Sequence, residues 1–216
     1  MSLVEKYALL PEEIDRRSIE VVEASLPQLD GLTAVERYVV CRIVRAEGDP
    51  EIAKAVGFSP GAVEHGTAAI KAKADVVTDV RMVEVGISKA LLARCGLTTR
   101  CQIDTPNTAE RAKSDGTTRS VAAIRELTPY LNGSIAVVGN APTALLALLD
   151  MIKEGQASPA LVIGMPVGFI ACAESKAELA KVNVLYISIW ERRGGSSAAA
   201  ATVNALLGLA LQEVAL

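Results

Sequence analysis

The chain has 216 residues, half of them hydrophobic, which is enough to bury one sizeable core and predicts a single domain over residues 1–216. Its 22 basic and 25 acidic residues leave a net charge of -3, and only 3% of residues are aromatic, so we expect no nucleic-acid surface. No apolar run approaches the roughly 20 residues that span a bilayer, and the first ten residues do not resemble a signal peptide, so we expect no membrane partner and a soluble, cytoplasmic protein.

The cysteines and the histidine do not form a metal-binding pattern. The single histidine, His65, falls in a predicted helix over residues 61–73, where we assign it a surface role. Cysteines among apolar residues are usually small core residues, and here they are scattered without a CxxC pair: Cys41, Cys95, Cys101 and Cys172. We therefore expect no metal site and no redox role for these thiols.

Two helices are predicted at the start of the chain. Apolar residues recur at helical spacing over residues 11–26, which places Ser18 inside the first helix. A T-x-x-E capping box at residues 33–36 opens a second helix that runs toward Gly48. Arg42 and Arg45 lie three residues apart in it and therefore share one face.

Five strands are predicted, and they alternate with helices. The run at residues 135–138 is continuously apolar, as is typical of a parallel strand that is covered on both faces. Strands that alternate with helices favour an α/β fold with a mostly parallel sheet between helices. The predicted strands are residues 75–78, 97–103, 135–138, 159–164 and 184–189.

Polar and glycine-rich turns follow four of these strands, after residues 78, 139, 164 and 190. In a parallel sheet such turns converge on one crevice, which is the expected ligand site. The turn at residues 139–142 opens a helix, and we expect its free amides to favour an anionic group, although any strand-to-helix joint has the same pattern. Likewise, residues 117–120 (TTRS) place hydroxyls and a guanidinium at a helix start, or serve only as its cap. These residue types suit a ligand that carries several carboxylates or phosphates.

Three long segments resemble the precorrin-8X methylmutase family of cobalamin biosynthesis: GNAPTALLALLDMI, PALVIGMPVGFIACAESKAEL and ERRGGSSAAAATVNALL. Supporting matches are IDRRS at residues 14–18, TDVRMV at 78–83 and TTRSVAA at 117–123, and together they span nearly the whole chain. The resemblance implies a three-layer α/β/α sandwich, for which we expect a five-stranded sheet. It also implies a homodimer. The alanine-rich helix after Gly195 offers a close-packing surface for the second copy; the alternative is that this helix only covers the sheet.

The resemblance also implies the reaction. Family members are isomerases that move a methyl group from ring carbon 11 to ring carbon 12 of a corrinoid with many carboxylate side chains, without a cofactor. Guanidinium groups would pair with the carboxylates, and glycines would let the ring approach the backbone. The substrate-binding positions implied are Ser18, Arg42, Thr118, Arg119, Asn140, Thr143, Arg192, Arg193 and Gly194.

The chain departs from the family pattern at its catalytic position. Family members carry a histidine there that protonates the macrocycle, whereas this chain has Arg45. A guanidinium stays protonated and is a poor general acid, so Arg45 would hold the ring electrostatically while water or Glu47 supplies the proton. Two alternatives stay open: a catalytically impaired member that binds corrinoid intermediates as a carrier or regulator, and an isomerase that acts on another tetrapyrrole. Glu191 also stands where the family usually has a glycine before its two basic residues.

Overall fold

A computed structural model describes residues 11–212, and its centre is one six-stranded sheet. The strand order is β1-β6-β5-β4-β2-β3, and every neighbouring pair is parallel except β1 with β6. The strands are β1 (Val56–Phe58), β2 (Val76–Thr78), β3 (Thr99–Arg100), β4 (Ile135–Val138), β5 (Leu161–Gly164) and β6 (Tyr186–Ile189).

The predicted count of five strands was wrong, because the sheet gains β1 at one edge. This strand has three residues, one of them Gly57, and it pairs with β6 at the far end of the sequence. Such a short strand has no apolar alternation of its own. The strand predicted over residues 97–103 shrinks to Thr99–Arg100 at the other edge of the sheet.

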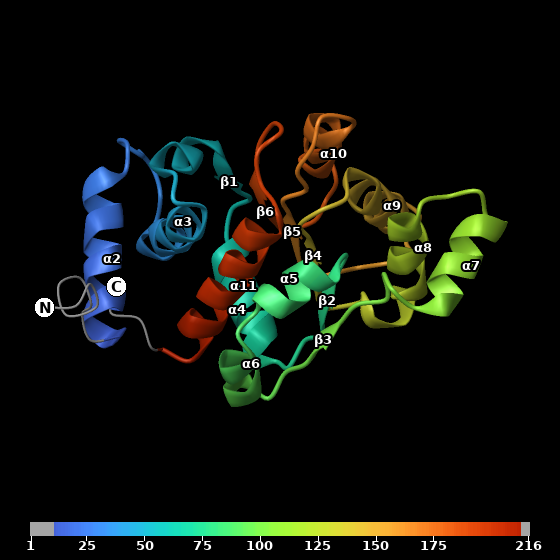
Figure 1. Cartoon of the computed structure of the whole chain (residues 1–216), viewed down its shortest axis with the longest axis horizontal. Helices are drawn as coiled ribbons and strands as arrows, with labels where there is room; N and C mark the ends of the chain where they lie inside the picture. Colours follow the sequence, from blue (N-terminus) through green and yellow to red (C-terminus); the bar gives the residue numbers. More distant parts are fainter. Residues whose placement is uncertain (1–10, 213–216) are drawn as a thin grey trace, which may run out of the picture.

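Helices cover both faces of the sheet, which confirms the predicted three layers. On β4, Ile135 and Val137 join the core under α3, α4 and α11, whereas Ala136 and Val138 join the core under α8 and α9 (Figure 1). The α-helices are α2 (Pro11–Ser25), α3 (Ala34–Glu47), α4 (Ala62–Lys71), α5 (Arg81–Gly86), α6 (Lys89–Cys95), α7 (Pro106–Ser114), α8 (Arg119–Glu126), α9 (Pro142–Lys153), α10 (Cys172–Leu179) and α11 (Ser196–Ala210), and the 3₁₀ helices are η1 (Pro50–Ala55) and η2 (Thr128–Tyr130).

Helix α11 lies in the centre of the molecule. Most of its alanines and leucines are buried in the core that it shares with α3 and α4. It therefore mainly covers the sheet, which was the alternative to a surface for a second copy. Figure 1 shows α2 at one end of the molecule, outside α3, and α7 at the opposite end.

Local signals in the sequence account for several element ends. The amide of Glu36 donates to the hydroxyl of Thr33, and the amide of Thr33 donates to the carboxylate of Glu36, so the predicted capping box opens α3. Gly48 ends that helix in the left-handed conformation, at φ 67°. The four cysteines are all buried, as predicted for small core residues, and each has a free thiol. Within residues 11–212, none of the helices has the length and apolar character needed to cross a bilayer.

Candidate active site

The turns that follow β2, β4, β5 and β6 lie at one edge of the sheet, because these four strands are parallel. Hydrogen bonds connect the turns directly. The amide of Gly195, after β6, donates to the carbonyl of Met165, after β5, at 2.9 Å. Asp79, after β2, accepts from the turn after β4. The turns therefore meet at one edge as predicted. That all four of them line a single crevice stays a prediction, because the cleft described next is lined only by segments that follow β2 and β6 and by α3.

The amides of the β4–α9 turn are not available to a ligand. The buried carboxylate of Asp79 accepts hydrogen bonds from the amides of Gly139, Asn140 and Ala141 at 3.0, 2.9 and 3.0 Å. Burial raises the pKa of Asp79, and these amide bonds oppose that shift. The expectation of free amides was therefore wrong for these three residues, because the carboxylate that they bind belongs to the protein itself.

A cleft of about 500 Å³ opens between α3, α5 and α11. Arg42 and Arg45 line it together, as expected from their three-residue spacing, and Ser196 and Ser197 line it from the start of α11. Met82 on α5 adds an exposed apolar side chain to this cleft. Two guanidiniums, the hydroxyl of Ser197 and an apolar wall form a surface suited to an amphipathic anion, whereas the hydroxyl of Ser196 is enclosed.

Arg45 also lines a second groove, of about 580 Å³, between α2 and α3. Ser18 lies in this groove, and its hydroxyl donates to the carbonyl of Ile14 at 2.6 Å, as a serine inside a helix commonly does. Arg45 is therefore the residue that the two concave surfaces share.

The threonines predicted for the site meet at two helix starts. Thr118 caps α8 by accepting from the amide of Val121, and its Oγ1 lies 3.3 Å from Oγ1 of Thr143 at the start of α9. Thr118 is thus both a cap and one member of a pair of hydroxyls. Arg119 is exposed beside this pair, and Asn140 lies one turn before Thr143 with its amide bound to Asp79.

The two arginines of the β6–α11 loop have different surroundings. Arg193 forms an ion pair with Asp49, which fastens the loop to the segment between α3 and η1. Arg192 is exposed, and its guanidinium lies 5.5 Å from the centre of the Phe169 ring. No carboxylate among the side chains that the structure describes pairs with Arg192, so it is the arginine of the loop that can receive an anion.

The same loop has an unusual backbone. Glu191 takes the left-handed conformation at φ 60°, which explains why a glycine suits this position. Gly194 has φ 132°, and a Cβ there would lie 2.6 Å from the carbonyl oxygen of Met165. Gly194 therefore acts through close packing of the loop onto the turn after β5.

Sequence reasoning missed two buried polar residues at this edge. Asp79 lies in the segment TDVRMV, and Lys176 lies in ESK, but neither has a local pattern that distinguishes it from a surface residue. Both are fully buried. Their partners come from turns elsewhere in the chain, so only the fold reveals them.

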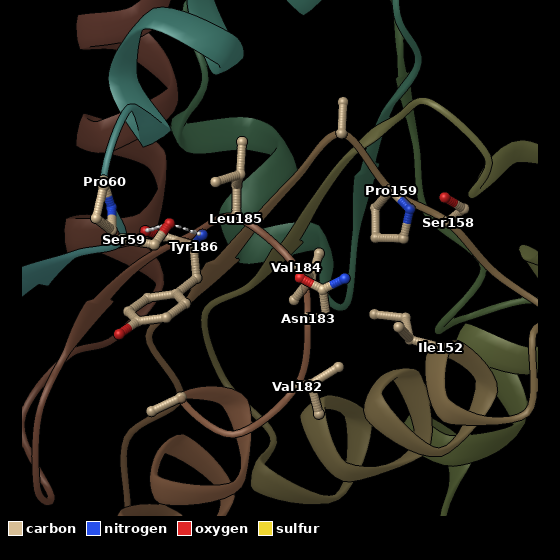
Figure 2. Close-up of a pocket in the computed structure, with 12 residues that line it drawn as sticks. Ser59, Pro60, Ile152, Ser158, Pro159, Val182, Asn183, Val184, Leu185 and Tyr186 are labelled. Atoms are coloured by element: carbon tan, nitrogen blue, oxygen red, sulfur yellow. Dashed lines mark hydrogen bonds between the residues drawn. The ribbon is translucent and has the colours of Figure 1, made fainter.

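Another cavity, of about 560 Å³, lies at the amino edge of the sheet, among Pro159, Leu185 and Tyr186. Figure 2 shows one wall of it, where the backbone amide of Tyr186 donates to the hydroxyl of Ser59 at 2.8 Å. No residue predicted for the site lines this cavity, and no charged side chain does either. His65 lies near the same edge, exposed, with Nδ1 2.8 Å from the carbonyl oxygen of Gly61, so its predicted surface position is confirmed.

Comparison with known proteins identifies the family. The model of the precorrin-8X methylmutase family matches residues 13–209. The chain belongs to this family. Its members are isomerases, which confirms the class of enzyme that the motifs indicated.

Relatives of the methylmutase family align with nearly the whole chain. A cobalt-precorrin-8 methylmutase of Priestia megaterium is 40% identical over 204 residues, which cover 93% of this chain and 88% of the relative. A precorrin-8X methylmutase of Pseudomonas aeruginosa is 39% identical and covers 90% and 94% of the two chains. These relatives bear the names of enzymes, which favours the enzyme over the alternative of a carrier or regulator.

A solved structure of the methylmutase family has the same fold. The precorrin-8X methyl mutase from Thermus thermophilus superimposes with a TM-score of 0.88 at 38% identity, covering 94% of this chain and 97% of the other. The α/β sandwich described above is therefore the methylmutase fold.

Proposed function

We propose that this methylmutase moves a methyl group from carbon 11 to carbon 12 of a precorrin-8-type corrinoid, with or without cobalt, in cobalamin biosynthesis. The names of its relatives support both forms of substrate. The observation that carries the proposal is the pair of guanidiniums, Arg42 and Arg45, on one wall of the cleft at the carboxyl edge. A flat macrocycle with a fringe of carboxylates matches a cleft that has cationic, hydroxyl and apolar walls.

We assign the roles in the site by charge and position. Arg42, Arg119 and Arg192 pair with substrate carboxylates. The hydroxyl groups come from Ser18, Thr118 and Thr143, and Asn140 supplies its side-chain amide, because its backbone amide is bound to Asp79. Arg193 and Gly194 act through the loop, since one is paired with Asp49 and the other packs against Met165. Because this division rests on contacts within the protein, truncation of Arg192 should cost more substrate affinity than truncation of Arg193.

The methyl shift needs a proton source, and a guanidinium is a poor one. Arg45 in this proposal holds the ring by its charge. Glu47 follows it at the end of α3, half-buried, and its Oε1 is enclosed without a hydrogen-bond partner among the described residues. Glu47 is therefore the first side chain to consider as a donor, with a bound water as the alternative.

The proposal includes a cytoplasmic homodimer. Its support in this chain is the loop after β5, where Phe169 and Ile170 are 81% and 85% exposed. Two adjacent large apolar residues on the surface are a common feature of an interface. This loop also contacts Arg192, so a partner seated on it would lie beside the site.

The experiment is a single-turnover incubation of precorrin-8X, and in parallel of its cobalt form, with excess protein. Migration makes carbon 11 trigonal and carbon 12 tetrahedral, so the product should have the mass of the substrate and a changed absorption spectrum. A bound but chemically unchanged corrinoid would contradict the proposed isomerisation.

A further inference from the structure

Lys176 is a lysine with no exposed surface, although it is the residue type that burial penalises most. It lies on α10, beneath the β6–α11 loop, and none of the carboxylates whose side chains the structure describes pairs with it. Burial lowers the pKa of Lys176. A buried ammonium without a carboxylate partner is costly, so the carbonyl groups and the sulfur of Cys172 around it must satisfy it.

The ammonium meets the loop on both sides of Arg192. Its Nζ donates to the carbonyl of Glu191 at 3.0 Å and to the carbonyl of Arg193 at 2.5 Å. The thiol of Cys172, on the same face of α10, lies 3.1 Å from the carbonyl oxygen of Pro166 and 3.5 Å from that of Glu191. Two carbonyls separated by one residue thus converge on one cation, which bends the backbone between them.

This bend determines where Arg192 points. Glu191 has the left-handed φ of 60°, which a residue with a side chain adopts only at a cost, and the bond from Lys176 to its carbonyl offsets that cost. The carbonyls that flank Arg192 face inward, and its own side chain extends outward over the ring of Phe169. The ion pair of Arg193 with Asp49 restrains the loop from the side.

We infer that Lys176 is a positioning residue for substrate binding, whose buried ammonium fixes the β6–α11 loop so that Arg192 meets a substrate carboxylate. The inference rests on the proposed function, since it takes Arg192 as a carboxylate ligand. Lys176 does not touch the substrate in this account. It acts only through the backbone of residues 191–193.

The test is a double-mutant cycle with K176M and R192Q, read by the chain's single tryptophan, Trp190, which begins the loop. Binding of precorrin-8X should quench Trp190, and the titration gives the dissociation constant. K176M and R192Q should each weaken binding about tenfold, the size of one charge-assisted hydrogen bond. The double variant should bind about as weakly as R192Q alone, because both changes remove the same contact.

Kinetics separate positioning from stability. K176M should raise KM with kcat within about twofold, since it removes binding and leaves the chemistry intact. A residue needed only for folding would instead lower kcat through a smaller active fraction at unchanged KM. K181M is the matched control, because Lys181 follows α10, is exposed and pairs with Glu178, and its KM should not change.

Four results would overturn the inference: effects of K176M and R192Q that multiply, a lowered kcat at constant KM, an equal effect of K181M, or failure of both K176M and K176Q to fold. K176Q, which keeps a neutral donor, should lie between the wild type and K176M. Failure of both Lys176 variants to fold would assign the lysine to the fold as a whole. A wild type that binds no corrinoid would contradict the proposed function and the inference together, whereas a binding wild type with any of the four results contradicts the inference alone.

Discussion

At the scale of residues, Arg45 has the most consequential position in the site. It belongs to both concave surfaces beside α3, so a ligand in either one meets its charge. A fixed cation attracts carboxylates but does not give and retake a proton near neutral pH. Binding and proton transfer should therefore respond differently to substitution at this position.

We predict that R45H raises the single-turnover rate by about 10²–10⁴-fold, the usual contribution of a general acid, while substrate affinity stays similar or weakens. The measurement is conversion of precorrin-8X by both proteins, together with a titration of each. If the single-turnover rate is neither raised in R45H nor lowered in R45Q, the proton comes from another group. A loss of turnover in E47Q would then identify Glu47 as that group.

The buried Lys176 predicts a dependence of stability on pH. Burial lowers its pKa below the ordinary value of 10.5, so between the lowered pKa and 10.5 the unfolded chain binds more protons than the folded chain. The free energy of unfolding of the wild type should therefore rise with pH relative to that of K176M over this window. Urea unfolding of both proteins from neutral pH to 10.5 checks the sign, and a constant or falling difference would contradict it.

At the scale of elements, the turn between β4 and α9 is held in place by a buried side chain from another part of the chain. One buried carboxylate, that of Asp79, takes three consecutive backbone amides of this turn. An amide side chain cannot do the same, because its NH₂ group would face backbone N–H donors.

We predict that D79N lowers the free energy of unfolding by about 1–3 kcal/mol, the cost of leaving a buried donor unsatisfied. D150N is the matched control, since Asp150 is exposed on α9, and it should change stability by less than about 0.5 kcal/mol. Urea denaturation measures both, and equal stability of the two variants would show that the turn does not depend on Asp79.

Some elements were predictable because their signals are local. The continuous apolar run at Ile135–Val138 gave both ends of β4, and the capping box with Gly48 gave both ends of α3. The edge strand β1 was not predictable, because its three residues become a strand only by pairing with β6, more than a hundred residues later. A pairing across that sequence separation leaves no local pattern.

The features of the site were likewise predictable where they depend on local spacing, and not where they depend on distant contacts. The shared face of Arg42 and Arg45 follows from helical spacing alone. The pairing of Arg193 with Asp49 joins residues 144 positions apart, and the burial of Asp79 and Lys176 depends on turns that meet only in the folded sheet. The sequence therefore predicted which residue types gather at the carboxyl edge. It did not predict which of these groups are already bound to other residues of the protein.

At the scale of the whole molecule, both faces of the sheet are filled by the chain's own helices. The exposed apolar residues lie elsewhere, and Phe169 and Ile170 on the loop after β5 are the most exposed of the large ones that the structure describes. A second copy has this loop available, whereas most of α11 is buried.

We predict that the protein is a dimer in solution, with twice the mass of 22.6 kDa, and that the paired substitutions F169E and I170E shift it toward the monomer by placing charges in an apolar contact. Light scattering at micromolar concentrations measures the mass. A value of 22.6 kDa for the wild type at every concentration would contradict the proposed dimer.

The most direct test of the account is single-turnover conversion of precorrin-8X by the wild type, R42Q and R125Q. Arg42 lines the cleft at the carboxyl edge, and Arg125, an exposed arginine in the last turn of α8, does not. We predict an isomer of unchanged mass from the wild type and from R125Q at the same rate, and binding about tenfold weaker for R42Q. Substrate that stays unchanged with the wild type, or an equal loss of binding in R125Q and R42Q, would contradict the assignment of the reaction to this cleft.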